Sequence, residues 1–202
     1  MARKGYHHGN LREALVTATI DLIREKGPTG FTMAEAAKQA GVSAAAPYRH
    51  FAGRDELIAE VALQGFEIFA DLMEYARTKG DPSPLSAFEA VGRAYLAFAR
   101  KYPGHYIAMF ESGVQVTSNA DLNQVASRAF NSLTEAAEDL VAHLPADSRP
   151  PASMVSNHIW AMSHGVVELF ARGERTARSP FRAEDLLETG IGVYLRGLGA
   201  IK

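Results

Sequence analysis

Apolar residues recur at the spacing of an α-helix in nearly every segment of this 202-residue chain. Residues 121–144 show the pattern most clearly, because their apolar side chains return at near-heptad spacing and so fall on one helix face. We find no run of alternating β-branched residues between turn signals, the pattern that is typical of a strand. The sequence therefore predicts an all-α fold.

Start and stop signals divide the chain into about nine helices, each preceded by a good capping residue or followed by Gly or Pro. The expected helices are 10–27, 32–41, a short one from 44, 54–77, 83–102, 105–111, 121–144, 153–172 and 183–198. A break at Gly80-Asp81-Pro82 follows the fourth. We expect an N-terminal domain of residues 1–54 and a larger helical domain of residues 55–202, connected by the helix at 54–77.

Composition excludes several classes of protein. With 47% hydrophobic and 22% charged residues, the chain can bury a core and does not resemble a disordered protein. It has no cysteine, which excludes disulfides, thiolate metal sites and thiol nucleophiles. The basic start is not followed by an apolar stretch, and no apolar run nears the roughly 20 residues of a membrane span. We expect a cytoplasmic protein with no membrane partner.

The two parts of the chain differ in charge. Residues 1–54 hold eight Lys or Arg against four acidic residues, a net charge of +4, whereas the remainder carries −6. A basic N-terminal domain on an acidic remainder is the footprint of a nucleic-acid binder whose overall charge, here −2, conceals it. The alternative is a chance scatter of solvated charges.

Residues 32–51 fit a helix-turn-helix. Thr32 and Glu35 have the spacing of a capping box, Gly41 allows the positive φ of a tight turn, and Ser43 is a good N-cap for the next helix. In this motif the second helix enters the DNA major groove, which is about 12 Å wide. The alternative is an ordinary helical hairpin inside a bundle.

The residues around this element extend the pattern. They are Tyr6-His7-His8-Gly9-Asn10-Leu11-Arg12, Phe31-Thr32, Gly41-Val42-Ser43, Tyr48-Arg49-His50-Phe51 and Arg54-Asp55-Glu56-Leu57. In sequence and spacing they closely resemble the N-terminal domain of the tetracycline-repressor (TetR) family of regulators. The resemblance implies a bacterial repressor that binds a palindromic operator in double-stranded DNA as a homodimer and is released by a small-molecule effector.

The resemblance also implies which side chains contact phosphates, the contacts that set register on DNA without reading its sequence. These are Thr32, Ser43, Tyr48, His50 and Arg54, the last at a position where the family usually has Lys. Arg3 and Lys4 would form an arm that enters the minor groove. The alternative for the arm is a disordered basic tail.

The implied base-facing surface is unusually apolar. It consists of Ala44, Ala45, Ala46 and Pro47, whose CH groups can touch thymine methyls, with Arg49 as the polar base reader. Pro47 lies in the first turn of the third expected helix, where it removes one N–H and disfavours helical geometry at Ala46. We therefore expect affinity to depend mainly on phosphate contacts.

Trp160-Ala161-Met162-Ser163-His164-Gly165 resembles the motif of one C-terminal class of the same family, characterised by Trp, His and Gly. The functional interpretation is an apolar cavity with a few polar groups, which suits a largely apolar effector. Its expected lining is Tyr95, Phe98, Tyr102, Tyr106, Met109, Phe110, Phe130, Trp160, His164 and Val167. The alternative is a packed Trp with a hydrogen-bonded core histidine.

The last two expected helices resemble the family's dimerisation pair, so that two copies would form a four-helix bundle. The expected interface is Val155, Ile159, Met162, Val166 and Phe170 on one helix, with Leu187, Ile191, Tyr194, Leu195 and Leu198 on the other. Dimerisation would place two recognition helices about 34 Å apart, one turn of DNA.

An enzyme is the main rival class, but its chemistry is weakly represented. His164 and Glu168 have the i, i+4 spacing of a metal-binding pair, whereas zinc needs three or four ligands and no second pair lies nearby in the sequence. The sequence has no phosphate-binding loop, nucleophile elbow or dinucleotide fingerprint, and we expect neither a cofactor nor catalysis. A helical scaffold for a protein partner is a third possibility, distinguished by showing no DNA binding at low salt.

Overall fold

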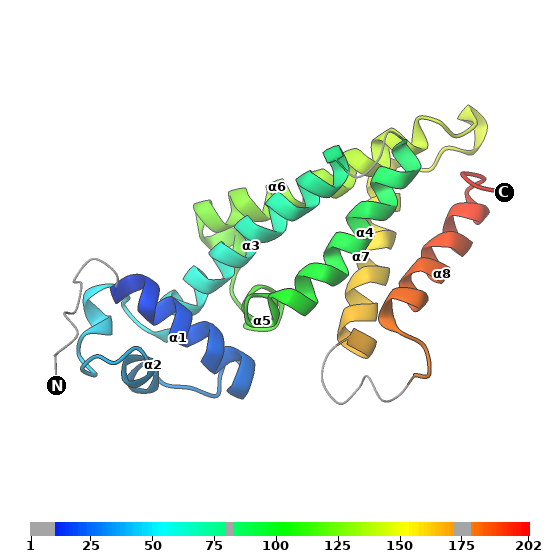
Figure 1. Ribbon diagram of the computed structural model, residues 1–202. Coiled ribbons are helices and arrows are strands. Elements are labelled where there is room, and N and C mark those ends of the chain that lie inside the picture. Colours follow the sequence, from blue (N-terminus) through cyan, green and yellow to red (C-terminus); the bar gives the residue numbers. More distant parts are fainter. Residues whose placement is uncertain (1–10, 80–82, 172–178) are drawn as a thin grey trace. The chain divides into compact units, whose positions relative to one another are not determined.

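The computed structural model describes residues 11–79, 83–171 and 179–202. These residues form eight α-helices with short 3₁₀ and π segments, and no strand occurs among them (Figure 1). The all-α class predicted from helical periodicity is confirmed. Within these ranges, no helix combines the length and the apolar character that a membrane span requires.

The chain folds into two compact units, and neither is a single continuous segment. The first unit contains the N-terminal residues up to Phe66 together with Tyr102–Asn123. The second unit contains Glu67–Lys101 and Gln124–Lys202. This grouping reflects packing and differs from a linear division at residue 54, which remains a prediction about function.

The first unit is built on α1 (Leu11–Lys26), which packs against both α2 (Met33–Gln39) and α5 (Pro103–Phe110). Helix α1 buries a stripe of residues at helical spacing, namely Leu15, Val16, Ala18, Thr19, Leu22 and Ile23. A Cβ on Gly104 would lie 2.7 Å from the Ile20 carbonyl oxygen. Because only glycine fits there, α5 approaches the backbone of α1 directly. This contact explains why residues so distant in sequence join the first unit.

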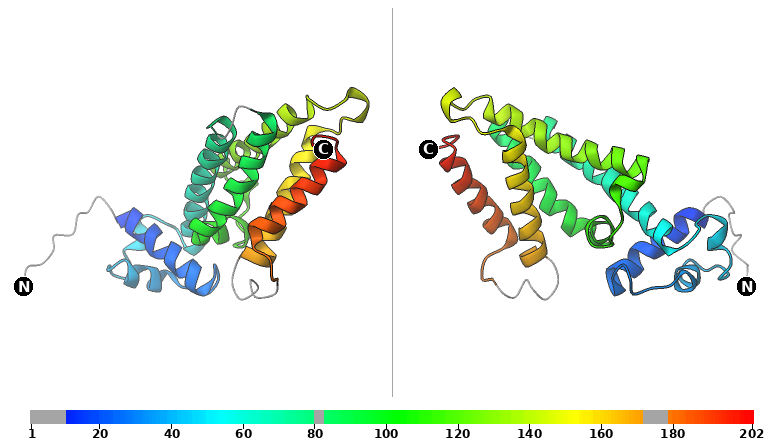
Figure 2. Two further views of the ribbon diagram at one scale, coloured as in Figure 1. Left: turned by 45° about the vertical axis from the view of Figure 1, so that its right-hand side comes forward. Right: turned by 180° about the vertical axis from the view of Figure 1, so that it is seen from behind.

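The second unit contains the C-terminal half of α3 (Arg54–Lys79), most of α6 (Ala120–Val141), and the whole of α4 (Pro84–Lys101), α7 (Ala152–Val166) and α8 (Ala183–Gly197). Helix α4 packs against α7 and α8, which themselves lie side by side (Figure 2). A single helix was predicted for residues 153–172. The structure has an α-helix to Val166 followed by a π-helical segment, Val167–Ala171.

The short helix predicted from Ala44 is wrong in kind. Residues 44–46 form turns, and a 3₁₀ helix, η1 (Pro47–Arg49), follows them. Pro47 has no N–H to donate to the carbonyl of Ser43, so the α-helical ladder cannot start there. Instead the N–H of Ala46 donates to Ser43 at 3.0 Å, and the N–H of Arg49 donates to Ala46 at 3.2 Å. Each of these bonds spans three residues, which is the 3₁₀ pattern.

Candidate nucleic-acid interface

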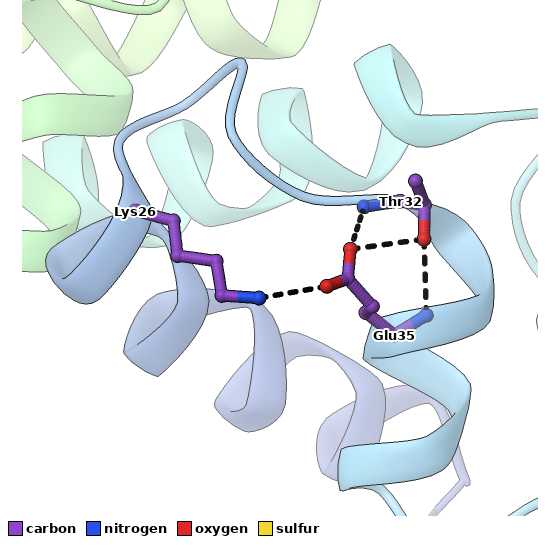
Figure 3. A network of polar contacts seen from close by, with 3 residues as sticks. All are labelled: Lys26, Thr32 and Glu35. Carbon is purple, nitrogen blue, oxygen red and sulfur yellow. Dashed lines mark hydrogen bonds and ion pairs between the residues drawn. The ribbon is translucent and has the colours of Figure 1, made fainter.

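A capping box fixes the start of α2, as its sequence predicts (Figure 3). The backbone N–H of Glu35 donates to the Thr32 hydroxyl at 3.2 Å, and that of Thr32 donates to the Glu35 carboxylate at 2.8 Å. Lys26, in the last turn of α1, donates to the other carboxylate oxygen at 2.7 Å. The Lys26 hydrogen bond, followed by those from Thr32, lowers the pKa of Glu35 to about 2. The carboxylate therefore links the end of α1 to the start of α2.

The turn after α2 is closed by Gly41, as predicted. Gly41 has a φ of 74°, in the left-handed region that glycine adopts most readily. Its N–H donates to Lys38 at 3.1 Å, and the N–H of Val42 donates to Ala37 at 2.9 Å. This pair of bonds is a Schellman motif, which ends the helix and reverses the chain.

The segment Ser43–His50, here called the recognition segment, is anchored by one buried residue within it and by another directly after it. Pro47 is buried, and Phe51 is only 2% exposed. The Arg12 guanidinium lies over the Phe51 ring, 5.4 Å from its centroid, and makes two hydrogen bonds of 2.6 Å to the Glu60 carboxylate. The segment is therefore clamped between α1 and the first turns of α3.

Most of the predicted DNA contacts lie at the surface around these anchors. The side chain of Tyr48 is 59% exposed, although tyrosine is a large and partly apolar residue. The other exposed members of the predicted set are Thr32, Ser43, Ala44, Ala45, Arg49 and His50, and Ala46 is half-buried. Pro47 was predicted to face the bases, and its burial corrects that prediction: the ring packs inward as an anchor. Arg3 and Lys4 lie outside the described residues.

Thr32 and Arg54 come together around one hollow at the starts of α2 and α3. The hollow is lined by Phe31, Thr32, Met33 and residues 52–56. Arg54 is partly buried there, and its guanidinium donates to the carbonyl of Thr29 at 3.3 Å and lies 3.6 Å from the Asp55 carboxylate. The carboxylates of Asp55 and Glu56 also line this hollow, and the backbone N–H of Ala52 donates to Glu56, so Arg54 supplies its positive charge beside two acidic side chains.

Six of the ten predicted pocket residues belong to the second unit, where four of them form an aromatic and polar cluster. Tyr95 is only 2% exposed, and its hydroxyl lies 2.9 Å from Nδ1 of His164. Trp160 contacts His164 and meets the ring of Phe130 edge-on at 5.0 Å. Its indole Nε1 is buried and has no hydrogen-bond partner among the described residues. Phe98 and Val167 are fully buried nearby in the core of the same unit.

The other four, Tyr102, Tyr106, Met109 and Phe110, belong to the first unit. A Cβ on Gly65 of α3 would lie 2.7 Å from the sulfur of Met109, so α5 lies close against α3 at this point. Sequence analysis did not single out His105, which is buried beside Tyr102. Burial lowers the pKa of the His105 imidazole and so favours its neutral form.

The predicted dimer residues divide into two groups. Five are already buried within the single chain and leave little surface for a partner: Val155, Ile159, Leu187, Ile191 and Leu195. Helix α4 packs against α7 and α8, and the core between the three helices takes these side chains. Met162, Val166, Phe170, Tyr194 and Leu198 are half-buried. Met154, Ala161 and Val193 of the same helices are exposed and were not in the predicted set, because nothing in an apolar stripe shows which part of it α4 covers.

The described residues contain no cluster of three or more His, Asp or Glu side chains that would suit a metal ion. His164, half of the pair considered from sequence, instead makes the hydrogen bond to Tyr95.

Comparison with known families matches both ends of this architecture. Residues 15–61 match "Bacterial regulatory proteins, tetR family", and residues 88–194 match "Tetracyclin repressor-like, C-terminal domain". The HTH-type transcriptional regulator BetI of Brucella anthropi is 29% identical over 189 residues, covering 92% of this chain and 94% of its own. The uncharacterized regulator YobS of Bacillus subtilis is 30% identical over half of each chain.

Solved structures have the same fold. A protein of unknown function from Rhodococcus sp. RHA1 aligns with a TM-score of 0.79 at 23% identity, covering 96% of this chain and 98% of its own. The TetR-family regulator PfmR of Thermus thermophilus aligns with a TM-score of 0.70 at 18% identity, covering 90% and 97%. The helix-turn-helix with its exposed recognition segment and the two family matches agree. The chain therefore belongs to the tetracycline-repressor family of DNA-binding transcriptional regulators, and it is not an enzyme.

Proposed function

We propose that this regulator is a repressor that binds a palindromic operator as a homodimer and releases it when a small-molecule effector binds. The observation that carries the DNA contact is the exposure of Tyr48, at 59%, on a segment whose neighbours Pro47 and Phe51 are buried. Because buried neighbours fix the backbone that carries this side chain, less of the segment has to be ordered when DNA binds, which favours binding.

The recognition segment would act mainly through phosphates. Ser43, Tyr48 and His50 supply exposed donors, and the partly buried guanidinium of Arg54 is a fourth candidate for a phosphate contact. The Thr32 hydroxyl already donates to Glu35 at 3.0 Å, so its part is to hold α2 in place. Arg49 is the one exposed residue of the segment suited to bidentate reading of guanine. Affinity for DNA should therefore fall steeply as salt rises.

The dimer would form through one face of α7 and α8, on which Met154, His158, Ala161, Val193 and Gly197 are exposed and Gly165 and Gly190 are half-buried. Met154 and Val193 are 49% and 59% exposed, which is high for apolar side chains. A Cβ added to Gly165 or Gly197 would meet nothing within 4 Å, so the space above both residues is open. Small residues let helices of a second copy approach closely and complete a four-helix bundle.

The effector would bind at the cluster of Tyr95, Trp160 and His164. A buried N–H without a partner costs about 1–3 kcal/mol, and the indole of Trp160 is such a group. A largely apolar effector with one hydrogen-bond acceptor would accept a hydrogen bond from this indole N–H. Its binding would change the spacing of the two recognition segments in the dimer, so that both could no longer contact DNA together.

The test uses fluorescence anisotropy with labelled DNA from upstream of the protein's own gene. Tyr48→Ala should weaken binding about tenfold, since each protomer loses a phosphate contact. The matched control is Tyr75→Ala, which removes a tyrosine of α3 that is 67% exposed, and it should leave affinity unchanged. Equal affinity of Tyr48→Ala and the unaltered protein would overturn the assignment.

A further inference from the structure

The second unit contains a hollow that none of the functions above uses. It lies between α4 and α8 and has a volume of about 250 Å³. Its floor is apolar and is made of Leu96, Leu187 and Ile191, all of them buried. Gly92 of α4 keeps this contact close, because a Cβ there would lie 3.2 Å from Ile191. The hollow can therefore hold an aliphatic body against a preformed floor.

The rim of the hollow is charged, and the charges do not balance. Three carboxylates and two guanidiniums line it. Arg100 pairs with Glu184 across the two helices, and Arg93 lies 3.8 Å from Glu89 along α4. Glu188 makes no hydrogen bond or ion pair within the described part of the chain, and a cation that its charge acts on, Arg182, is already paired with Asp185 at 2.6 Å. The lining residues thus carry one more negative than positive charge, next to an apolar floor.

We propose that this hollow binds a small primary amine, with the aliphatic chain on Leu96, Leu187 and Ile191 and the ammonium group at Glu188. A primary ammonium has three N–H donors, which Glu188 and the neighbouring rim carboxylates can accept. None of the nine lining residues is aromatic. Quaternary ammonium groups, which carry no N–H and are bound by aromatic cages, do not suit this site.

This site is separate from both surfaces proposed above. On α4, the lining residues Glu89, Arg93, Ala97 and Arg100 are partly or fully exposed, whereas Tyr95, which reaches His164, belongs to the buried stripe of the same helix. On α8, the hollow uses positions 184, 187, 188 and 191, and the proposed dimer face uses positions 190, 193 and 197. An amine, an effector and a second copy could therefore be bound at once.

The experiment titrates the full-length protein with hexylamine, hexanoate, 1-hexanol and hexyltrimethylammonium, and follows backbone amide signals of α4 and α8 by NMR. All four probes have the same six-carbon chain and differ in the head group. Hexylamine should give saturable shifts, and the other three should bind more weakly or not at all. Because no DNA is present, a failure here does not bear on the proposed repressor function.

Two variants test the site, and a third is the control. Glu188→Gln should weaken hexylamine binding by up to about fivefold, the upper end of the range for an exposed charge pair. Ala97→Leu fills the hollow from an exposed helix position and should abolish the saturable shifts. Glu138→Gln, which removes an exposed carboxylate of α6, should change nothing. Equal binding of hexanoate and hexylamine, unchanged affinity in Glu188→Gln, or no saturable shift with hexylamine would each overturn the proposal.

Discussion

The recognition segment and the cluster around Trp160 differ in how far their hydrogen-bonding groups are satisfied within the chain. In the recognition segment, backbone groups form 3₁₀ hydrogen bonds with one another, and the buried residues Pro47 and Phe51 anchor the segment. At the cluster, a buried indole N–H has no partner among the described residues, beside half-buried aromatic rings. A rigid surface loses little conformational entropy when it binds DNA. A site that responds to a ligand gains affinity when the ligand supplies a hydrogen bond that the protein alone leaves unmade.

The largest expected effect on stability comes from removing an anchor of the recognition segment. Phe51→Ala removes a buried anchor, and we expect a loss of about 3–5 kcal/mol in unfolding free energy, measured by urea denaturation. DNA affinity should fall with it. Phe181→Ala, at a phenylalanine that is 63% exposed, should change stability by less than about 0.5 kcal/mol. A similar loss in both variants would show that Phe51 is not an anchor.

A smaller loss of stability is expected from removing the hydrogen bond that the Trp160 cluster does form, between Tyr95 and His164. Tyr95→Phe removes the hydroxyl that lies 2.9 Å from His164 and should cost about 1 kcal/mol. Thermal denaturation measures this loss. Tyr75→Phe, on an exposed tyrosine, serves as the control and should be neutral. If Tyr95→Phe were as stable as the unaltered protein, the bond would not support the cluster.

Trp160→Phe should impair the response to effector more than it impairs stability. It deletes the indole N–H that lacks a partner and keeps an aromatic ring. We expect stability to stay within about 1 kcal/mol, since loss of ring volume and loss of an unsatisfied N–H oppose each other. The effector should at the same time lose its influence on DNA binding. A variant that still released DNA at the usual effector concentration would contradict the role given to the indole.

The smallest effect concerns pH. The pKa of Glu35 is about 2 in the folded protein, below its ordinary value of 4.5, so its contribution is present above pH 4.5 and is lost as pH falls toward 2. The melting temperature of Glu35→Gln should be lower than that of the unaltered protein at pH 7, and the gap should narrow below pH 4.5. Glu25→Gln, an exposed acid of α1 outside the capping box, should show no such trend.

The sequence correctly predicted the features that depend only on residues close together in the chain. The Thr32 and Glu35 spacing and the glycine at position 41 depend on a few neighbouring residues, and both predictions are confirmed. The burial of Pro47 was not predicted, because its ring can face either way until Phe51 defines an inner side. The close contact of Gly104 with Ile20 joins residues far apart in sequence, and no periodicity encodes it.

The interleaved units have a consequence for dissecting the protein. The chain passes between the two units within α3, before Tyr102 and after Asn123. A fragment that ends near residue 54 would therefore lack α5, and α1 would expose to water the backbone that Gly104 now covers. The DNA-binding part is thus not a detachable module, and grafting it onto another sensor would require carrying residues 102–123 as well.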